Sequence, residues 1–231
     1  MPTAVVTGAN SGIAHAFAKI LIDEGYNVYA VDKDDGDGLK ALSASATTHI
    51  LDVASVESIK KFKNDLGDEP VDLLLNVAGV ASGHAKDGLE TTNLDILQRT
   101  FAVNTFGPLL LTQVLLPNIL KSPKPKIGIV SSRVGSIGDN SSGGHYAYRA
   151  SKAAVNSIGK SLANDLRDKG VGVMLLHPGF VRTNILPADS MPPEAVEAEE
   201  AASKLWQNIV SKKELEDSGK FWHREGYELP W

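Results

Sequence analysis

The sequence predicts an α/β protein built as one doubly wound parallel sheet with helices on both faces. Short apolar runs rich in β-branched residues alternate with longer amphipathic runs along the 231 residues. The apolar runs are nearly continuous, which is typical of parallel strands that are buried on both faces. Their alternation with helical patterns favours βαβ units, whose right-handed crossovers bring the carboxyl ends of the strands to one edge.

The expected elements follow the chain without a linker or a repeat, so we expect one domain over residues 1–231. The acidic run DKDDGDG at 32–38 is interpreted as a loop, and the aromatic tail 219–231 is expected to pack onto the body. Strands are expected at 4–7, 27–31, 48–51, 71–76, 126–132 and 171–177. Helices are expected at about 12–25, 55–66, 95–120, 147–168 and 194–212.

Composition excludes several classes of function. A net charge of -5 gives no basic face for nucleic acid, and no apolar run approaches the length of a membrane span. The first apolar run begins at Ala4, which leaves no room for a signal or transit peptide. The chain has no cysteine, and its six histidines lack metal-ligand spacing, so neither a disulfide nor a metal site is expected. We therefore expect a metal-free cytoplasmic protein.

A glycine turn follows the first strand. Gly8 and Gly12 form a G-x-x-x-G pattern that leads into a helix. Gly8 permits a tight turn, and Gly12 lets the backbone approach a pyrophosphate at the positive end of that helix. Ala14 occupies the last position of the motif, where a small residue packs helix against strand. A plain β–α turn with two glycines is the alternative interpretation.

Asp32 ends the second strand, 20 residues after Gly12, where a carboxylate can accept hydrogen bonds from the adenine ribose. The same charge would repel the 2′-phosphate of NADP, and Ser11 stands where a basic residue would help to bind it. Lys33 is the one neighbouring residue that could accommodate that phosphate. These residues favour NAD as cofactor, with NADP as the alternative, and a solvated acid in an acidic loop is the other interpretation of Asp32.

Tyr148 and Lys152 have the i, i+4 spacing that places them on one face of a helix. An ammonium beside a phenol favours the phenolate and so lowers the pKa of the tyrosine. The neighbouring strand ends in Ser131 and Ser132. Asn104 lies inside an apolar helix, where an amide is unfavourable unless it finds a partner.

Two other strands also end in polar or small residues, Asn76 before a small-residue turn and Pro178-Gly179 before Thr183. The whole set, in this order, resembles the short-chain dehydrogenase/reductase family, which has a Rossmann-type three-layer α/β/α fold. The segments around 104–117 and 131–156 are similar to the C-factor-like and sniffer-like carbonyl reductase branches. Ala14 and Val77 depart from the family pattern, which has a glycine and an asparagine there.

The resemblance implies a role for each matched residue. Tyr148 is the general acid in reduction and the base in oxidation, and Lys152 lowers its pKa and binds the nicotinamide ribose. Ser132, rather than Ser131, hydrogen-bonds the substrate oxygen, and Asn104 supports a water relay. The residues expected to contact the cofactor are Gly8, Asn10, Ser11, Gly12, Ile13, Asp32, Lys33, Asp52, Val53, Asn76, Ala78, Gly79, Tyr148, Lys152, Pro178, Gly179, Val181 and Thr183.

We therefore expect an NAD(P)-dependent oxidoreductase for a carbonyl or secondary alcohol, with a short substrate lid at about 184–200. A cofactor-binding signalling protein of C-factor type is the alternative. A homodimer or homotetramer through the helices at 95–120 and 147–168 is also implied. Arg133, His145 and Arg149 are interpreted equally as substrate contacts or as solvent-facing residues. His177 and the three tryptophans are expected to be structural.

Overall fold

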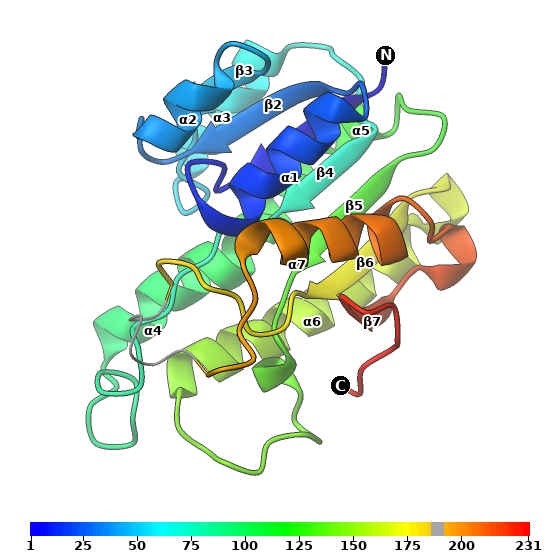
Figure 1. Cartoon of the computed structure of the whole chain (residues 1–231). Helices are drawn as coiled ribbons and strands as arrows, with labels where there is room; N and C mark the ends of the chain where they lie inside the picture. Colours follow the sequence, from blue (N-terminus) through cyan, green and yellow to red (C-terminus); the bar gives the residue numbers. More distant parts are fainter. Residues whose placement is uncertain (186–191) are drawn as a thin grey trace.

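A seven-stranded, all-parallel sheet forms the centre of the computed structural model, which describes residues 1–185 and 192–231 (Figure 1). The strand order is β3-β2-β1-β4-β5-β6-β7. The order reverses between β1 and β4, and the crevice beyond the carboxyl ends of these strands is where such sheets bind ligands. The strands are β1 (Thr3–Thr7), β2 (Asn27–Asp32), β3 (Thr47–Ile50), β4 (Leu73–Asn76), β5 (Lys126–Val130), β6 (Gly172–His177) and β7 (Lys220–His223).

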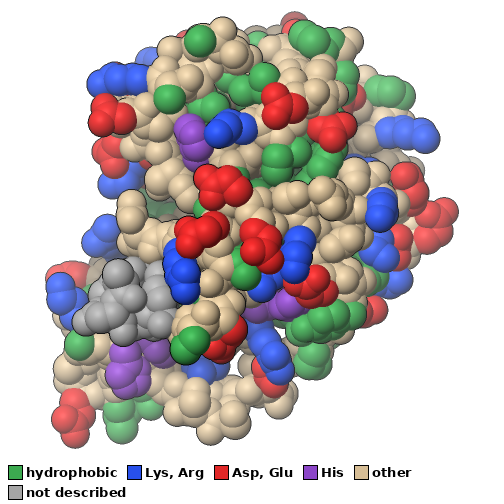
Figure 2. All heavy atoms as spheres, in the orientation of Figure 1, with side chains coloured by type: hydrophobic (Ala, Val, Ile, Leu, Met, Phe, Trp, Pro, Cys, Tyr) green, Lys and Arg blue, Asp and Glu red, His purple; other side chains and the backbone are tan. Residues whose placement is uncertain are grey.

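Helices cover both faces of the sheet (Figure 1). One face is covered by α1 (Gly12–Asp23), α2 (Asp37–Leu42) and α7 (Ala198–Leu205), which continues into a π-helical turn (Trp206–Val210). The other face is covered by α3 (Val56–Leu66), α5 (Gly107–Ile119) and α6 (Tyr146–Leu166). Phe17 and Leu205 are fully buried in the first layer, and Phe62 and Val155 are buried in the second. The outer surface of α7 carries charged side chains (Figure 2). Among them, Lys204 pairs with Glu200 and with Glu225.

All six expected strands are present, and the structure adds two elements. β7 comes from the aromatic tail, which packs as expected and also pairs with β6 through Phe221 opposite Leu175. Its four residues carry no repeating pattern, so only the partner strand defines them as a strand. α2 begins at Asp37, inside the acidic run interpreted as a loop, and it is held by burial of Leu39 and Leu42.

A long helical stretch connects β4 to β5. It consists of α4 (Leu94–Phe101), a π-helical turn (Ala102–Phe106) and α5. Among the described residues, one helical stretch is long and apolar enough to cross a membrane, judged by length and composition alone. It is this stretch, Leu94–Ile119. The sequence did not suggest such a span, because polar residues interrupt the apolar run. Leu111, Leu115 and Ile119 are fully buried on the sheet, so the stretch is a core helix of this domain.

Ala14 is 2% exposed and packs in the core beneath α1. We predict that Ala14→Gly lowers the free energy of unfolding by about 1 kcal/mol, because glycine costs that much in a helix interior. Nucleotide affinity should stay within about twofold, since the side chain faces the core. Urea unfolding and a fluorescence titration with NADH measure the two quantities. Tighter nucleotide binding in the glycine variant would contradict a purely packing role.

Candidate active site

The predicted catalytic residues meet at the carboxyl edge of the sheet, where α6 passes the end of β5. Tyr148 and Lys152 occupy the first two turns of α6, and the Lys152 Nζ atom lies 5.7 Å from the centre of the Tyr148 ring. The Ser132 hydroxyl lies close enough to the Tyr148 phenol to lower its pKa. Lys152 Nζ also donates to the Val130 carbonyl oxygen at 2.9 Å. The helical spacing and the strand end therefore bring the hydroxyl, the phenol and the ammonium together.

Burial determines the charges of this group. It raises the pKa of Tyr148 to about 12, and the hydrogen bond from Ser132 opposes part of that rise. Burial also lowers the pKa of Lys152 to about 8. The lowering of the phenol pKa that we expected from Lys152 is not found, because the cost of taking the phenolate out of water dominates. Tyr148 is accordingly a neutral proton donor at neutral pH.

Asn104 lies in the π-helical turn between α4 and α5, and π-turns are frequent at functional sites. Its buried side chain binds the backbone of Val80 in both directions, accepting from the N–H at 2.8 Å and donating to the carbonyl oxygen at 2.9 Å. Its amide also donates to Ser151 Oγ at 3.1 Å. Ser151 Oγ in turn donates to the Tyr148 carbonyl oxygen at 2.8 Å. Asn104 therefore positions α6, while its part in a water relay stays a prediction.

Asp87, which the sequence did not single out, is bonded to the first turn of α6. Its carboxylate accepts hydrogen bonds from the Ala147 N–H at 2.8 Å and from the Tyr148 N–H at 3.0 Å. The side chain is 1% exposed and also accepts from Thr92 Oγ1 at 2.9 Å. No local pattern could have revealed this contact, since 60 residues separate Asp87 from Ala147.

The turn that carries Ser132 is packed tightly against α6. A Cβ on Gly135 would lie 2.7 Å from the carbonyl carbon of Lys152, so only glycine allows this approach. The Arg133 N–H donates to His177 Nδ1 at 3.2 Å. Burial lowers the pKa of His177 to about 3, so the ring is neutral and can accept this bond. His177 is thus a structural residue, as expected, and it holds the turn that carries Ser132.

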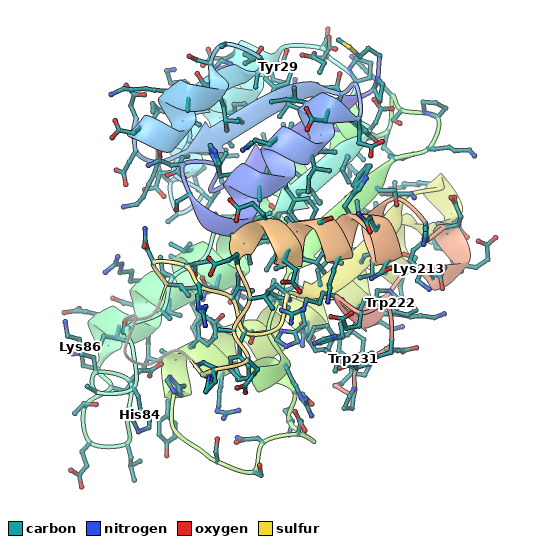
Figure 3. The ribbon with its side chains drawn as sticks, in the orientation of Figure 1. Tyr29, His84, Lys86, Lys213, Trp222 and Trp231 are labelled. Atoms are coloured by element: carbon teal, nitrogen blue, oxygen red, sulfur yellow. The ribbon has the colours of Figure 1, made fainter. Side chains whose placement is uncertain are left out.

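Arg133, His145 and Arg149 were interpreted equally as substrate contacts or as solvent-facing residues. In the structure they mainly contact neighbouring loop residues. Arg133 forms an ion pair with Asp139. Arg149 donates to the carbonyl oxygens of Val134 at 3.0 Å and Gly144 at 3.1 Å. His145 packs beside His84, which lies on the loop after β4, with ring centres 4.9 Å apart (Figure 3). The tryptophans pack as expected: Trp206 and Trp222 are buried, and Trp231 stacks on Phe221.

The glycine turn meets segments that are distant in sequence. Gly8 has φ +81°, and a Cβ there would lie 3.0 Å from the Cα of Ala78. Gly12 has φ +58°, and its Cβ would lie 3.1 Å from Thr183 Cγ2. Within the described part of the chain, the Ser11 side chain makes no capping hydrogen bond to α1. The amides at the start of α1 therefore remain open to an anion, which fits the expected pyrophosphate.

The turn after β4 is held by one hydroxyl. Thr7 Oγ1 accepts from the Val77 N–H at 3.0 Å and from the Ala78 N–H at 3.1 Å. The backbone of the turn is thus fixed without the side chain at position 77, which explains how Val77 is tolerated there. Asn76 is 3% exposed, and its amide atoms have no hydrogen-bond partner among the described residues. Such an orphaned amide beside the glycine turn fits a site that a dinucleotide completes.

Asp32 lies at the adenine side of the glycine turn. Its carboxylate accepts from the Asn10 N–H at 3.0 Å and from the Asp34 N–H at 3.3 Å. The Asn10 side-chain oxygen accepts from the Leu39 N–H at 3.0 Å, so this amide anchors the segment after β2. Lys33 pairs with Asp34 at 3.2 Å, with both side chains largely exposed. The neighbouring cation Lys33 is therefore balanced by a second acid.

The remaining predicted contacts border the same crevice or support it. Asp52 Oδ1 accepts from the Ala54 N–H at 2.9 Å. Val53 is buried against the first residue of α5, Gly107, where a Cβ would lie 3.0 Å from Val53. Ile13 packs with Val181 in a small apolar cluster. Pro178 and Gly179 follow β6, and the Pro178 carbonyl oxygen accepts from Arg224 at 2.7 Å.

Both described ends of the expected lid contribute to a hollow of about 230 Å³, which is lined by Gly12, Asn184 and Glu197, among other residues. Residues 186–191 of the lid are outside the described residues. Val181 pairs with Val196, which joins the two described ends of this segment. In residues 1–185 and 192–231 no cluster of three or more potential metal ligands is found.

Comparison with known proteins identifies the fold and the family. The family model described as short chain dehydrogenase matches residues 2–192. The chain belongs to the short chain dehydrogenase family. This membership confirms the fold, the enzyme class and the resemblance inferred from the sequence.

Two relatives illustrate the range of this family. The chain is 39% identical over 233 residues to a 1-hydroxy-2-glutathionyl-2-methyl-3-butene dehydrogenase from Rhodococcus sp. (strain AD45), and the match covers 100% of both chains. It is also 35% identical over 173 residues to the C-signal protein of Myxococcus xanthus, covering 75% of this chain and 100% of that protein.

Solved structures of carbonyl reductases have the same fold. The NADPH-bound carbonyl reductase from chicken fatty liver superposes with a TM-score of 0.89 at 27% identity, covering 100% of this chain and 99% of that one. Carbonyl reductase Sniffer of D. melanogaster has a TM-score of 0.87 at 25% identity, with 100% of both chains covered. This short chain dehydrogenase therefore shares its whole architecture with nicotinamide-dependent reductases.

Proposed function

We propose that this chain is an NAD-dependent oxidoreductase that interconverts a carbonyl compound and a secondary alcohol, with Tyr148 as its general acid and base. The observation that carries the proposal is the grouping of half-buried Ser132 and Tyr148 with buried Lys152 at the carboxyl edge of the sheet. A signalling protein that only binds a nucleotide has no need of such a proton-donating group. The C-signal relative is therefore weaker support than the relatives named as dehydrogenases and reductases.

The bound nicotinamide supplies or accepts the hydride at the substrate carbon. In reduction, the hydroxyls of Ser132 and Tyr148 donate hydrogen bonds to the substrate oxygen, and Tyr148 then gives its proton to that oxygen. The ammonium of Lys152, 5.7 Å from the ring centre, stabilises the phenolate that remains. In oxidation the same phenolate takes the proton back from the alcohol.

Support for NAD comes from the charge around the end of β2. A 2′-phosphate beside Asp32 would face that carboxylate and Asp34, while the neighbouring cation, Lys33, is already paired with Asp34. Like charges at a few ångströms cost about 1–4 kcal/mol near a protein surface. The chicken reductase that binds NADPH is a 27% identical relative, so its cofactor does not decide the choice here.

Assembly and location are carried forward as proposals from the resemblance. Leu94 and Phe106, on the helix expected at a subunit interface, are 65% and 50% exposed, which supports a homodimer or homotetramer. A small-molecule substrate and a cytoplasmic location complete the proposal.

Tyr148→Phe should abolish turnover, with kcat at least about 1,000-fold lower, because no other described group can give the proton to the substrate oxygen. NADH binding should be unchanged, since the phenyl ring keeps the packing. Nicotinamide absorbance over a panel of carbonyl compounds and alcohols measures turnover, and fluorescence measures binding. Residual turnover close to that of the unmodified protein would refute the assignment of Tyr148.

Direct titration with both nucleotides tests the cofactor assignment, and NADH should bind more tightly than NADPH. Asp32→Ala should shift the preference toward NADPH by at least about tenfold in kcat/KM, which corresponds to about 1.4 kcal/mol. Asp35→Ala, three residues further along the exposed loop, serves as the matched control and should leave the preference in place. A native preference for NADPH would overturn the proposal for NAD.

The rate of carbonyl reduction should be level below the Lys152 pKa of about 8 and should fall above it. The sign follows from the mechanism: as Lys152 loses its proton, the phenolate left by proton transfer loses its stabilising cation. Tyr148 stays protonated throughout, because its pKa is about 12. Measurement of kcat/KM across pH in native protein and in Lys152→Met checks this. If the fall near pH 8 persists in Lys152→Met, another group is responsible.

A further inference from the structure

The backbone of Tyr148 is held at both its N–H and its carbonyl group by side chains. The N–H donates to Asp87 at 3.0 Å. The carbonyl oxygen accepts from Ser151 Oγ at 2.8 Å, and Ser151 is bonded through Asn104 to the backbone of Val80. Asp87 thus holds the N–H directly, whereas the carbonyl oxygen is held by Ser151 of α6 itself, which Asn104 connects to Val80.

Asp87 does the work of an N-cap for α6. His145, the residue at the N-cap position, has φ 51° and its own side chain makes no capping hydrogen bond. The first N–H groups of a helix have no partner within the helix, and a carboxylate is the best acceptor for them. The bonds from Asp87 to Ala147 and Tyr148 are those that an N-cap side chain ordinarily makes to the second and third helical residues.

The carboxylate is itself fixed before it meets the helix. The Asp87 N–H donates to the Gly83 carbonyl oxygen at 3.0 Å, and Thr92 Oγ1 donates to its side chain at 2.9 Å. The Thr92 N–H closes the same loop by donating to the Gly88 carbonyl oxygen at 3.0 Å. With 1% of the residue exposed, the carboxylate is shielded from solvent, so these hydrogen bonds hold it.

We propose that Asp87 is the positioning residue of the catalytic tyrosine. It fixes the first turn of α6, and thereby places the Tyr148 hydroxyl against Ser132 and at its distance from Lys152. Asp87 touches neither substrate nor cofactor in this role and acts through the backbone of Tyr148. The inference rests on the proposed function of Tyr148, because a precise phenol position matters only if the phenol transfers the proton.

The proposal predicts a loss of kcat with nucleotide binding preserved. Misplacement of a reacting group by about 1 Å can cost about 100-fold in rate, so Asp87→Ala should lower kcat by about 10- to 100-fold. Asp87→Asn keeps one acceptor oxygen and should give an intermediate loss. The dissociation constant for NADH should stay within about twofold in both, because the glycine turn is untouched.

Asp72→Asn is the matched control. Asp72 is also a partly buried carboxylate that accepts from a backbone N–H, that of Thr3 at 2.7 Å, and from a hydroxyl, Ser122 Oγ at 2.6 Å. It lies at the amino end of the sheet, directly before β4, away from the catalytic group. This variant should lose stability while keeping kcat within about twofold of native protein.

Hydrogen exchange and two milder variants keep the test decisive if Asp87→Ala does not fold. Hydrogen exchange of the peptide that contains Ala147 and Tyr148 should be faster in Asp87→Asn and unchanged in Asp72→Asn. If Asp87→Ala does not fold, Asp87→Asn and Thr92→Val, which removes only the supporting hydroxyl, carry the kinetic test. A native kcat in folded Asp87→Asn, or an equal loss of kcat in Asp72→Asn, would overturn the proposal. Persistent turnover in Tyr148→Phe would instead overturn the proposed function. The hydrogen-exchange result would then test only whether Asp87 caps α6.

Discussion

The burial of Lys152 is the constraint on which the carboxyl edge of this sheet depends. Its side chain is 3% exposed, so its ammonium must find partners inside the protein. The Val130 carbonyl oxygen at the end of β5 supplies one. Gly79 in the turn after β4 lies beside it, since a Cβ there would be in ordinary contact with Nζ at 3.7 Å. The end of β5, the turn after β4 and the start of α6 are therefore fitted around one cation.

The strands end at this edge, and single polar side chains join the loops that follow them. Thr7 holds the turn after β4, Asn104 ties that turn to α6, and His177 holds the turn after β5. Each is buried among loops and satisfies backbone groups that would otherwise be unpaired. This arrangement joins separated segments at the candidate site without any covalent link. It also explains why polar residues occur at strand ends that packing alone would fill with apolar ones.

Much of the fold could be predicted because buried parallel strands and amphipathic helices carry their periodicity in the local sequence. The strands at β1, β4 and β6 are continuous apolar runs, and the spacing of Tyr148 and Lys152 follows from helical geometry. β7 could not be predicted, since its four residues become a strand only by pairing with β6. α2 was missed for a similar reason: its acidic start resembles a loop until Leu39 and Leu42 are buried.

The sequence by itself determined the order of the elements, the glycine turn and the helical spacing of the phenol and ammonium groups of Tyr148 and Lys152, because these depend on contacts within a few residues. Tertiary structure alone decided the protonation of those groups. A nearby lysine predicts a lowered phenol pKa, whereas burial raises that pKa to about 12 and brings Lys152 down to about 8. It alone also revealed Asp87, since a hydrogen bond across 60 residues leaves no local pattern. Desolvation and long-range hydrogen bonds depend on what surrounds a residue in space, and that is information the linear order of residues does not contain.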